Sequence, residues 1–121
     1  MKKILIIEDD KFLRELIGQK LNKESYEIFE AVDGEEGIKK IKGKKPDLVL
    51  LDIILPGING FEVLDKMKEN TVLSRIPVII LSNLGHKDDV EKGLKMGAND
   101  YLIKAHFTPD QIIEKVKTIL K

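Results

Sequence analysis

The 121-residue chain contains no cysteine and no tryptophan, and only 5% of its residues are aromatic. Without cysteine it can form no disulfide, offers no thiolate nucleophile and cannot build a cysteine-based zinc site. It also carries no net charge, because 21 basic residues balance 21 acidic ones. This balance gives no electrostatic reason to expect direct binding to nucleic acid or to an anionic membrane.

Long apolar runs are missing as well. The run that follows the N-terminal lysines, Ile4–Ile7, gives way at once to acidic residues. It is much shorter than the apolar region of a secretory signal or the roughly 20 apolar residues of a membrane helix. We therefore expect a cytoplasmic protein. The 42% hydrophobic fraction and the length fit one folded domain. We expect that domain to cover residues 1–121 as a stand-alone module without an output domain.

Short apolar runs alternate along the chain with segments of helical periodicity. The runs predict five strands, at Ile4–Ile7, Tyr26–Ala31, Leu48–Leu51, Val78–Leu81 and Tyr101–Ile103. The first, third and fourth runs are apolar throughout, which is typical of strands covered on both faces of a parallel sheet. Strict alternation of strands and helices predicts an α/β fold with right-handed crossovers and helices on both faces of the sheet.

The first three predicted helices carry clear sequence signals. An apolar stripe that we expect to face the core marks the first helix, at Phe12, Leu13, Leu16, Ile17 and Leu21. Each of the next two begins with a capping box, a reciprocal pair of hydrogen bonds between the cap and the third helical residue. The residues of these two boxes are Asp33 with Glu36, and Asn59 with Glu62.

The last two predicted helices also have recognisable ends. The fourth runs from about His86 to Met96 and ends at Gly97, a typical C-terminal cap. Its apolar residues, Val90 and Leu94, are four apart. The fifth helix has a complete set of start signals, with a cap, a proline at the first helical position and a capping box. These residues are Thr108, Pro109 and Gln111.

Polar residues follow the predicted strands at the points where the strands end. Glu8 and Asp9 follow the first strand, Asp52 the third, Ser82 the fourth and Lys104 the fifth. Taken singly, Asp9 could merely cap a helix, Ser82 could be a loop residue and Lys104 a solvated lysine. In an open parallel sheet, however, these strand ends meet at one edge, where ligands bind.

Three carboxylates at one edge repel one another, so the cluster requires a cation or a raised pKa. Oxygen ligands of this kind suit Mg²⁺. Lys104 and Ser82 would then supply a positive charge and a hydrogen bond to an anion beside the metal. A carboxylate nucleophile, a metal and an anion clamp together indicate phosphoryl transfer to an aspartate.

Four segments resemble the receiver domains of two-component response regulators, particularly the stand-alone chemotaxis response regulator. They occur in family order and at family spacing along the whole chain, at Ile4–Asp10, Asp47–Gly60, Pro77–Ser82 and Gly97–Lys104. The resemblance implies a flavodoxin-like, doubly wound sheet with strand order 2-1-3-4-5 and five helices.

The resemblance also implies a role for each acidic residue. Asp52 would accept a phosphoryl group from a sensor histidine kinase or a phosphotransfer protein. Asp9, Asp52 and the backbone carbonyl of Ile54 would hold Mg²⁺, and Glu8 would act through a metal-bound water. The chain would then be a signalling phosphoacceptor and not an enzyme. It would catalyse only its own phosphorylation and dephosphorylation.

The remaining site residues would bind the phosphoryl group and transmit its presence. Lys104 and Ser82 would bind the phosphoryl oxygens, and Tyr101 would be the switch aromatic that turns inward when Ser82 moves. The fourth helix, fifth strand and fifth helix would then change their surface for a downstream protein target. We expect a monomer or a phosphorylation-dependent dimer.

Some positions depart from the family pattern. Ala105 replaces a proline that usually follows a cis bond, and a cis bond before alanine costs about 3 kcal/mol. We therefore expect a trans Lys104–Ala105 bond. Ile54 and Leu84 are apolar where the family tunes hydrolysis of the acyl phosphate, so hydrolysis should be slow.

Three other functions compete with phosphoryl acceptance. The chain could be a pseudo-receiver, a phosphorylation-independent interaction module, although its site residues are complete. An aspartate-dependent phosphatase would need a second aspartate two residues after Asp52, where Ile54 stands. A flavin-binding protein would need a phosphate-binding loop after the first strand, and this chain has none there.

Overall fold

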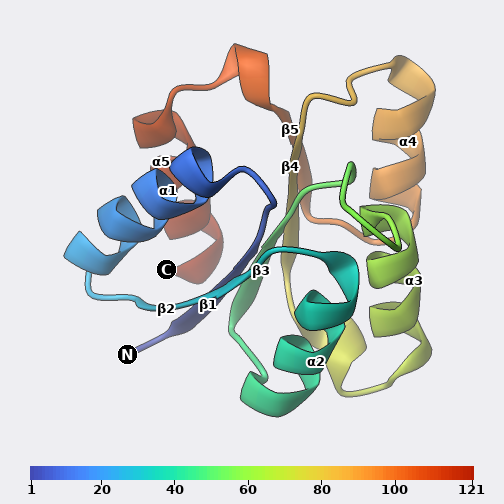
Figure 1. Cartoon of the computed structure of the whole chain (residues 1–121), viewed down its shortest axis with the longest axis horizontal. Helices are drawn as coiled ribbons and strands as arrows, with labels where there is room; N and C mark the ends of the chain where they lie inside the picture. Colours follow the sequence, from blue (N-terminus) through green and yellow to red (C-terminus); the bar gives the residue numbers. More distant parts are fainter.

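The computed structural model describes residues 1–121 and consists of a five-stranded parallel sheet between two layers of helices (Figure 1). The strands are β1 (Lys3–Ile7), β2 (Glu27–Ala31), β3 (Leu48–Leu51), β4 (Val78–Ser82) and β5 (Asp100–Ile103). Their order in the sheet is β2-β1-β3-β4-β5, and each neighbouring pair is parallel. The predicted strand order is therefore confirmed.

Five α-helices connect or follow the strands. They are α1 (Lys11–Lys23), α2 (Gly34–Lys44), α3 (Gly60–Glu69), α4 (Lys87–Lys95) and α5 (Pro109–Leu120), with short 3₁₀ turns η1 (Leu73–Arg75) and η2 (Lys104–His106). The helices α1 and α5 cover one face of the sheet, and α2, α3 and α4 cover the other (Figure 1). No helix has the length and apolar composition that a membrane span requires.

The sheet separates two apolar clusters, one beneath each layer of helices. Alternate residues of a strand point to opposite faces, so β1 sends Ile4 and Ile6 into one cluster and Leu5 and Ile7 into the other. All four side chains are buried. Burial on both faces explains why the central strands are apolar without interruption.

The predicted capping boxes form at two of three helices. Both hydrogen bonds of the box are present at α3 and at α5. At α2 the prediction was half wrong. Asp33 accepts a hydrogen bond from the N–H of Glu36 at 2.8 Å. The Glu36 carboxylate does not return to Asp33 but lies 3.4 Å from the Lys40 ammonium, one helical turn on.

Two apolar residues of the predicted helices are exposed. Phe12, expected to face the core, is 77% exposed, and Leu94 is 45% exposed. The buried face of α1 comprises Arg14, Ile17, Gly18 and Leu21. Phe12 lies about 200° around the helix from Arg14 and so points away from this face. Leu94 follows Gly93, the buried residue of α4. The predicted cap Gly97 is confirmed, with a φ of 104° and an N–H that donates to the Leu94 carbonyl.

Candidate functional site

Three carboxylates meet at the carboxyl edge of the sheet, where β1 and β3 end. These strands are adjacent, with Ile7 beside Leu51, so the residues that follow them are neighbours. One oxygen from each of Glu8, Asp9 and Asp52 lies within 4.8 Å of the others. Glu8 is 3% exposed and Asp52 4% exposed, whereas Asp9 is exposed. The cluster therefore has two buried members and one that faces solvent.

Lys104 joins the two buried carboxylates. Its Nζ lies 2.6 Å from Glu8 Oε1 and 2.8 Å from Asp52 Oδ2. The structure contains no cis peptide bond, so the predicted trans bond between Lys104 and Ala105 is confirmed. A trans bond without proline thus suffices to direct Lys104 into the acidic cluster.

Burial and mutual charge shift the pKa values of this cluster. Burial raises the pKa of Glu8 to about 7, and the charge of Asp52 adds to the rise, while hydrogen bonds from Lys104 and the Asp10 N–H oppose it. Burial alone would lower the pKa of Lys104, but its bonds to Asp52 and Glu8 outweigh burial and raise that pKa. Lys104 is therefore an ammonium at neutral pH.

The backbone on either side of Asp52 is closely fixed. The Asp52 N–H donates to the Ile7 carbonyl at 3.0 Å, and its Oδ1 accepts from the Ile54 N–H at 3.2 Å. The Asp52 carbonyl touches Gly60 at the start of α3, where an added Cβ would lie 2.3 Å from that oxygen. Only glycine fits there, so the turn that presents Asp52 and Ile54 depends on Gly60. The Ile54 side chain is 58% exposed.

Ser82 and Tyr101 reach the same backbone segment from two strands. Ser82 is fully buried at the end of β4, and its Oγ accepts a hydrogen bond from the Leu84 N–H at 3.3 Å. Tyr101, in β5, is 7% exposed and donates its hydroxyl to the Leu84 carbonyl. Burial raises the pKa of Tyr101 to about 12, with the negative charges of Asp89 and Asp52 adding to the rise. The tyrosine ring, which we expected to turn inward when Ser82 moves, thus already lies inward, and Leu84 bridges it to Ser82.

Comparison with known proteins identifies the family. A family model of the response regulator receiver domain matches residues 4–117. The chain belongs to this family. It is 35% identical to the alkaline phosphatase synthesis transcriptional regulatory protein PhoP of Bacillus subtilis, over 99% of this chain and 49% of that protein. It is 37% identical to the phosphate regulon transcriptional regulatory protein PhoB of Pseudomonas aeruginosa, over 99% of this chain and 52% of that protein.

Solved receiver domains have the same fold. The BeF3-activated N-terminal receiver domain of RstA from Klebsiella pneumoniae superposes with a TM-score of 0.88 at 30% identity, covering 98% of each chain. The receiver domain of the Francisella response regulator 1452 gives a TM-score of 0.90 at 30% identity, covering 98% of this chain and 96% of that one. This receiver domain spans about half the length of the curated relatives named above. That it stands alone, like a chemotaxis regulator, stays a prediction.

The receiver domain also holds a buried arginine that the sequence analysis missed. Arg14 Nη1 donates to the Glu8 carbonyl at 2.9 Å, and Nε donates to Glu30 Oε1 in β2 at 2.7 Å. Arg14 is 9% exposed. Its spacing from Ile17 and Leu21 places it on the buried face of α1, and a charged residue there needs a partner. That spacing is the signal that could have revealed it.

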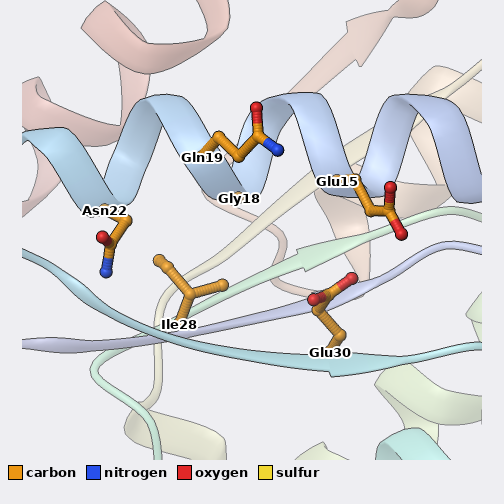
Figure 2. A pocket seen from close by; sticks show the side chains of 6 residues that line it. All are labelled: Glu15, Gly18, Gln19, Asn22, Ile28 and Glu30. Carbon is orange, nitrogen blue, oxygen red and sulfur yellow. The ribbon is translucent and has the colours of Figure 1, made fainter.

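A hollow on the flank of the receiver domain lies between α1 and β2 (Figure 2). Its lining comprises Glu15, Gly18, Gln19, Asn22, Ile28 and Glu30. None of the site residues described above lines it. Glu30 already pairs with Arg14. The hollow therefore offers no unpaired buried charge that could act at the acidic cluster.

Proposed function

We propose that this receiver domain accepts a phosphoryl group on Asp52 from the phosphohistidine of a sensor kinase or phosphotransfer protein. The observation that carries the proposal is the contact between a buried carboxylate and a partly buried ammonium beside further carboxylates. Lys104 Nζ lies 2.8 Å from Asp52 Oδ2, and Glu8 and Asp9 complete the cluster. A nucleophile, a cation for the incoming anion and a set of metal ligands are thus side by side.

The donor atoms of the cluster fit Mg²⁺. All three are carboxylate oxygens, the hard ligands that this ion prefers. When ionised, three carboxylates and one ammonium leave two negative charges in excess, which a divalent cation balances. Asp9, Asp52 and the backbone carbonyl of Ile54 would hold the ion, and Glu8 would act through a bound water. When bound, Mg²⁺ would supply positive charge that offsets the charge of the phosphoryl oxygens.

The residues of the chain account for the transfer itself. A carboxylate oxygen of Asp52 attacks phosphorus, so that a P–O bond forms while the P–N bond to the donor histidine breaks and the imidazole leaves with the electron pair. The Lys104 ammonium, already beside Asp52, stays with the transferred group and binds one of its oxygens. Ser82 accepts a hydrogen bond from Leu84, so its own hydroxyl proton is available to a second phosphoryl oxygen.

The same residues suggest how phosphorylation changes the surface. Ser82 and Tyr101 both bond to the backbone of Leu84, so a shift of Ser82 toward the phosphoryl group displaces that segment and the ring. The surface of α4, β5 and α5 would change for a downstream protein target, with the domain a monomer or a phosphorylation-dependent dimer. We propose that its direct contacts are with proteins rather than nucleic acid, and that it acts on no other substrate.

Mass spectrometry of the intact chain tests this function. Acetyl phosphate with Mg²⁺ should add one phosphoryl group to the wild type and none to Asp52→Asn. Asp65→Asn, which changes an exposed carboxylate on α3, should be labelled like the wild type. Labelling should cease when a chelator removes the metal. Equal labelling of Asp52→Asn would refute the role of Asp52, and an unlabelled wild type would favour a phosphorylation-independent interaction module.

A further inference from the structure

Few side chains hold α4 against the rest of the domain. Gly93 is its single buried residue, and Val90 packs partly against the apolar cluster of that face. On the side toward α3, the Lys92 ammonium lies 4.3 Å from the centre of the Phe61 ring, a cation–π contact. The position of α4 therefore depends largely on what Gly93 touches.

Gly93 touches the ring of Tyr101. A Cβ added at this position would lie 2.7 Å from Ile80 Cδ1, 2.9 Å from Tyr101 Cδ2 and 3.2 Å from Tyr101 Cε2. The Gly93 backbone is helical, a conformation that any residue adopts, and glycine is less favourable than alanine inside a helix. The need for space beside the tyrosine ring, and not a need for special backbone angles, therefore accounts for glycine here.

We propose that Gly93 is a positioning residue whose missing side chain forms a socket for the Tyr101 ring, so that the ring determines where α4 sits. The inference rests on the proposed function, because it gives the route by which phosphorylation of Asp52 regulates α4. The route runs from Ser82 through the Leu84 backbone to the Tyr101 hydroxyl. It ends where the ring fills the socket at Gly93.

Alanine at position 93 would close the socket. The end of the Ile80 side chain can turn away from a new methyl group, but the Tyr101 ring is rigid and must leave its inward position. An outward ring loses its hydroxyl contact with Leu84 and no longer packs beneath α4. The helix would then no longer respond to events at Asp52, although Gly93→Ala changes no atom of the acidic cluster.

Fluorescence quenching tests the socket without any phosphorylation. The chain has two tyrosines and no tryptophan, so Tyr26→Phe leaves Tyr101 as the only strong emitter. In that background, Gly93→Ala should increase quenching of Tyr101 by acrylamide toward that of a free tyrosine amide. The matched control is Gly37→Ala in α2, where the new Cβ would lie 2.6 Å from Ile7 Cδ1, far along the chain from Tyr101. Quenching that is unchanged in Gly93→Ala, or raised equally in both variants, would overturn the socket.

A second pair of variants separates loss of the socket from general damage. Gly93→Ala should lower the melting temperature of the wild type, because the methyl group and the ring compete for one space. In a Tyr101→Ala background the ring is gone, so the same substitution should raise the melting temperature through the better helix propensity of alanine. A fall of equal size in both backgrounds would contradict a specific contact between Gly93 and Tyr101.

Hydrogen exchange then tests whether phosphorylation of Asp52 acts on α4 through the Tyr101 ring. Acetyl phosphate with Mg²⁺ should change amide exchange in α4 of the wild type, and this change should be lost in Gly93→Ala while mass spectrometry still shows one phosphoryl group on Asp52. An equal exchange response in both proteins would overturn the proposal. If neither protein is phosphorylated, the proposed function fails instead, and the quenching and melting experiments still decide whether the socket exists.

Discussion

The raised pKa of Glu8 makes the metal-free domain sensitive to pH. Burial is the main cause, and the Asp52 charge adds to it, so that the pKa rises from 4.5 to about 7. The folded state therefore binds the proton more tightly than the unfolded chain. The stabilisation from this proton is complete below pH 4.5 and is lost as the pH rises through 7. We expect Glu8→Gln, which is neutral at every pH, to abolish this loss.

The size of the effect follows from the shift. One pKa unit corresponds to about 1.4 kcal/mol, so the full rise is worth about 3 kcal/mol. Of this, about 2–3 kcal/mol falls between pH 5 and pH 8. The Glu8 side chain is 4% exposed, so water screens little of this energy. Relative to Glu8→Gln, the wild type should lose that amount of unfolding free energy over this pH interval.

Urea denaturation followed by far-ultraviolet circular dichroism measures these free energies, with a chelator present to remove divalent ions. Glu69→Gln, at an exposed glutamate at the end of α3, is the control and should follow the wild type. Parallel pH curves for the wild type and Glu8→Gln would refute the reasoning. With Mg²⁺ in place of the chelator, the wild type should gain more stability than Glu8→Gln, because a cation near Glu8 favours its ionised form.

Three further predictions concern glycines, a strained lysine and the acyl phosphate. Gly18→Ala should stabilise the domain by about 0.5–1 kcal/mol, because the new Cβ would meet Ile28 and Ile6 at ordinary distances of 3.6 and 3.8 Å beside the hollow of Figure 2. Lys45, the C-cap of α2, has a φ of 46°, in the left-handed region that favours glycine. Lys45→Gly should therefore raise the free energy of unfolding by about 1 kcal/mol by removing this backbone strain. Finally, Ile54→Asn should shorten the lifetime of phosphorylated Asp52, because an exposed polar side chain can orient the attacking water.

Thermal unfolding checks the first two of these predictions. Gly37→Ala serves as the contrast to Gly18→Ala and should destabilise by about 1–3 kcal/mol, because its Cβ would crowd Ile7. Equal effects of Gly18→Ala and Gly37→Ala on stability would show that the packing around the new methyl group does not determine these effects. For the acyl phosphate, the decay of the labelled chain in Mg²⁺ is compared between the wild type and Ile54→Asn. Leu84 packs against the apolar cluster and is left unchanged. An unchanged decay rate in Ile54→Asn would mean that water access is controlled elsewhere than at Ile54.

The sequence predicted the strands and the strand ends well, because both depend on local patterns. Continuous apolar runs indicated buried parallel strands, and the parallel order then placed Glu8, Asp52 and Lys104 at one edge. Boundaries moved by a residue or so, with β1 beginning at Lys3 and β2 at Glu27. The paired contacts of Lys104 depend on the path of η2, which no local pattern specifies.

The errors arose where a partner distant in sequence decides burial. A hydrophobic stripe suggested that Phe12 faces the core, but the buried face of α1 includes Arg14, which is tolerable only because Glu30 and the Glu8 carbonyl receive its guanidinium. The missing half of the α2 capping box is a different, local error, because Glu36 pairs with Lys40 on the next turn and not with the N-cap backbone. The contact between Gly93 and Tyr101 likewise joins a helix to a strand, and only the assembled fold shows it.

The two hydrogen bonds of Arg14 connect the acidic cluster to the edge strand of the sheet. The strand β2 has β1 as its one neighbour, and Arg14 ties Glu30 in this strand to the peptide that precedes Asp9. Native proteins open locally in contiguous units, so each detachment of β2 frees the guanidinium and loosens its hold on that peptide. Protection of the β2 amides from exchange and the residence time of a cation at the cluster should therefore rise and fall together.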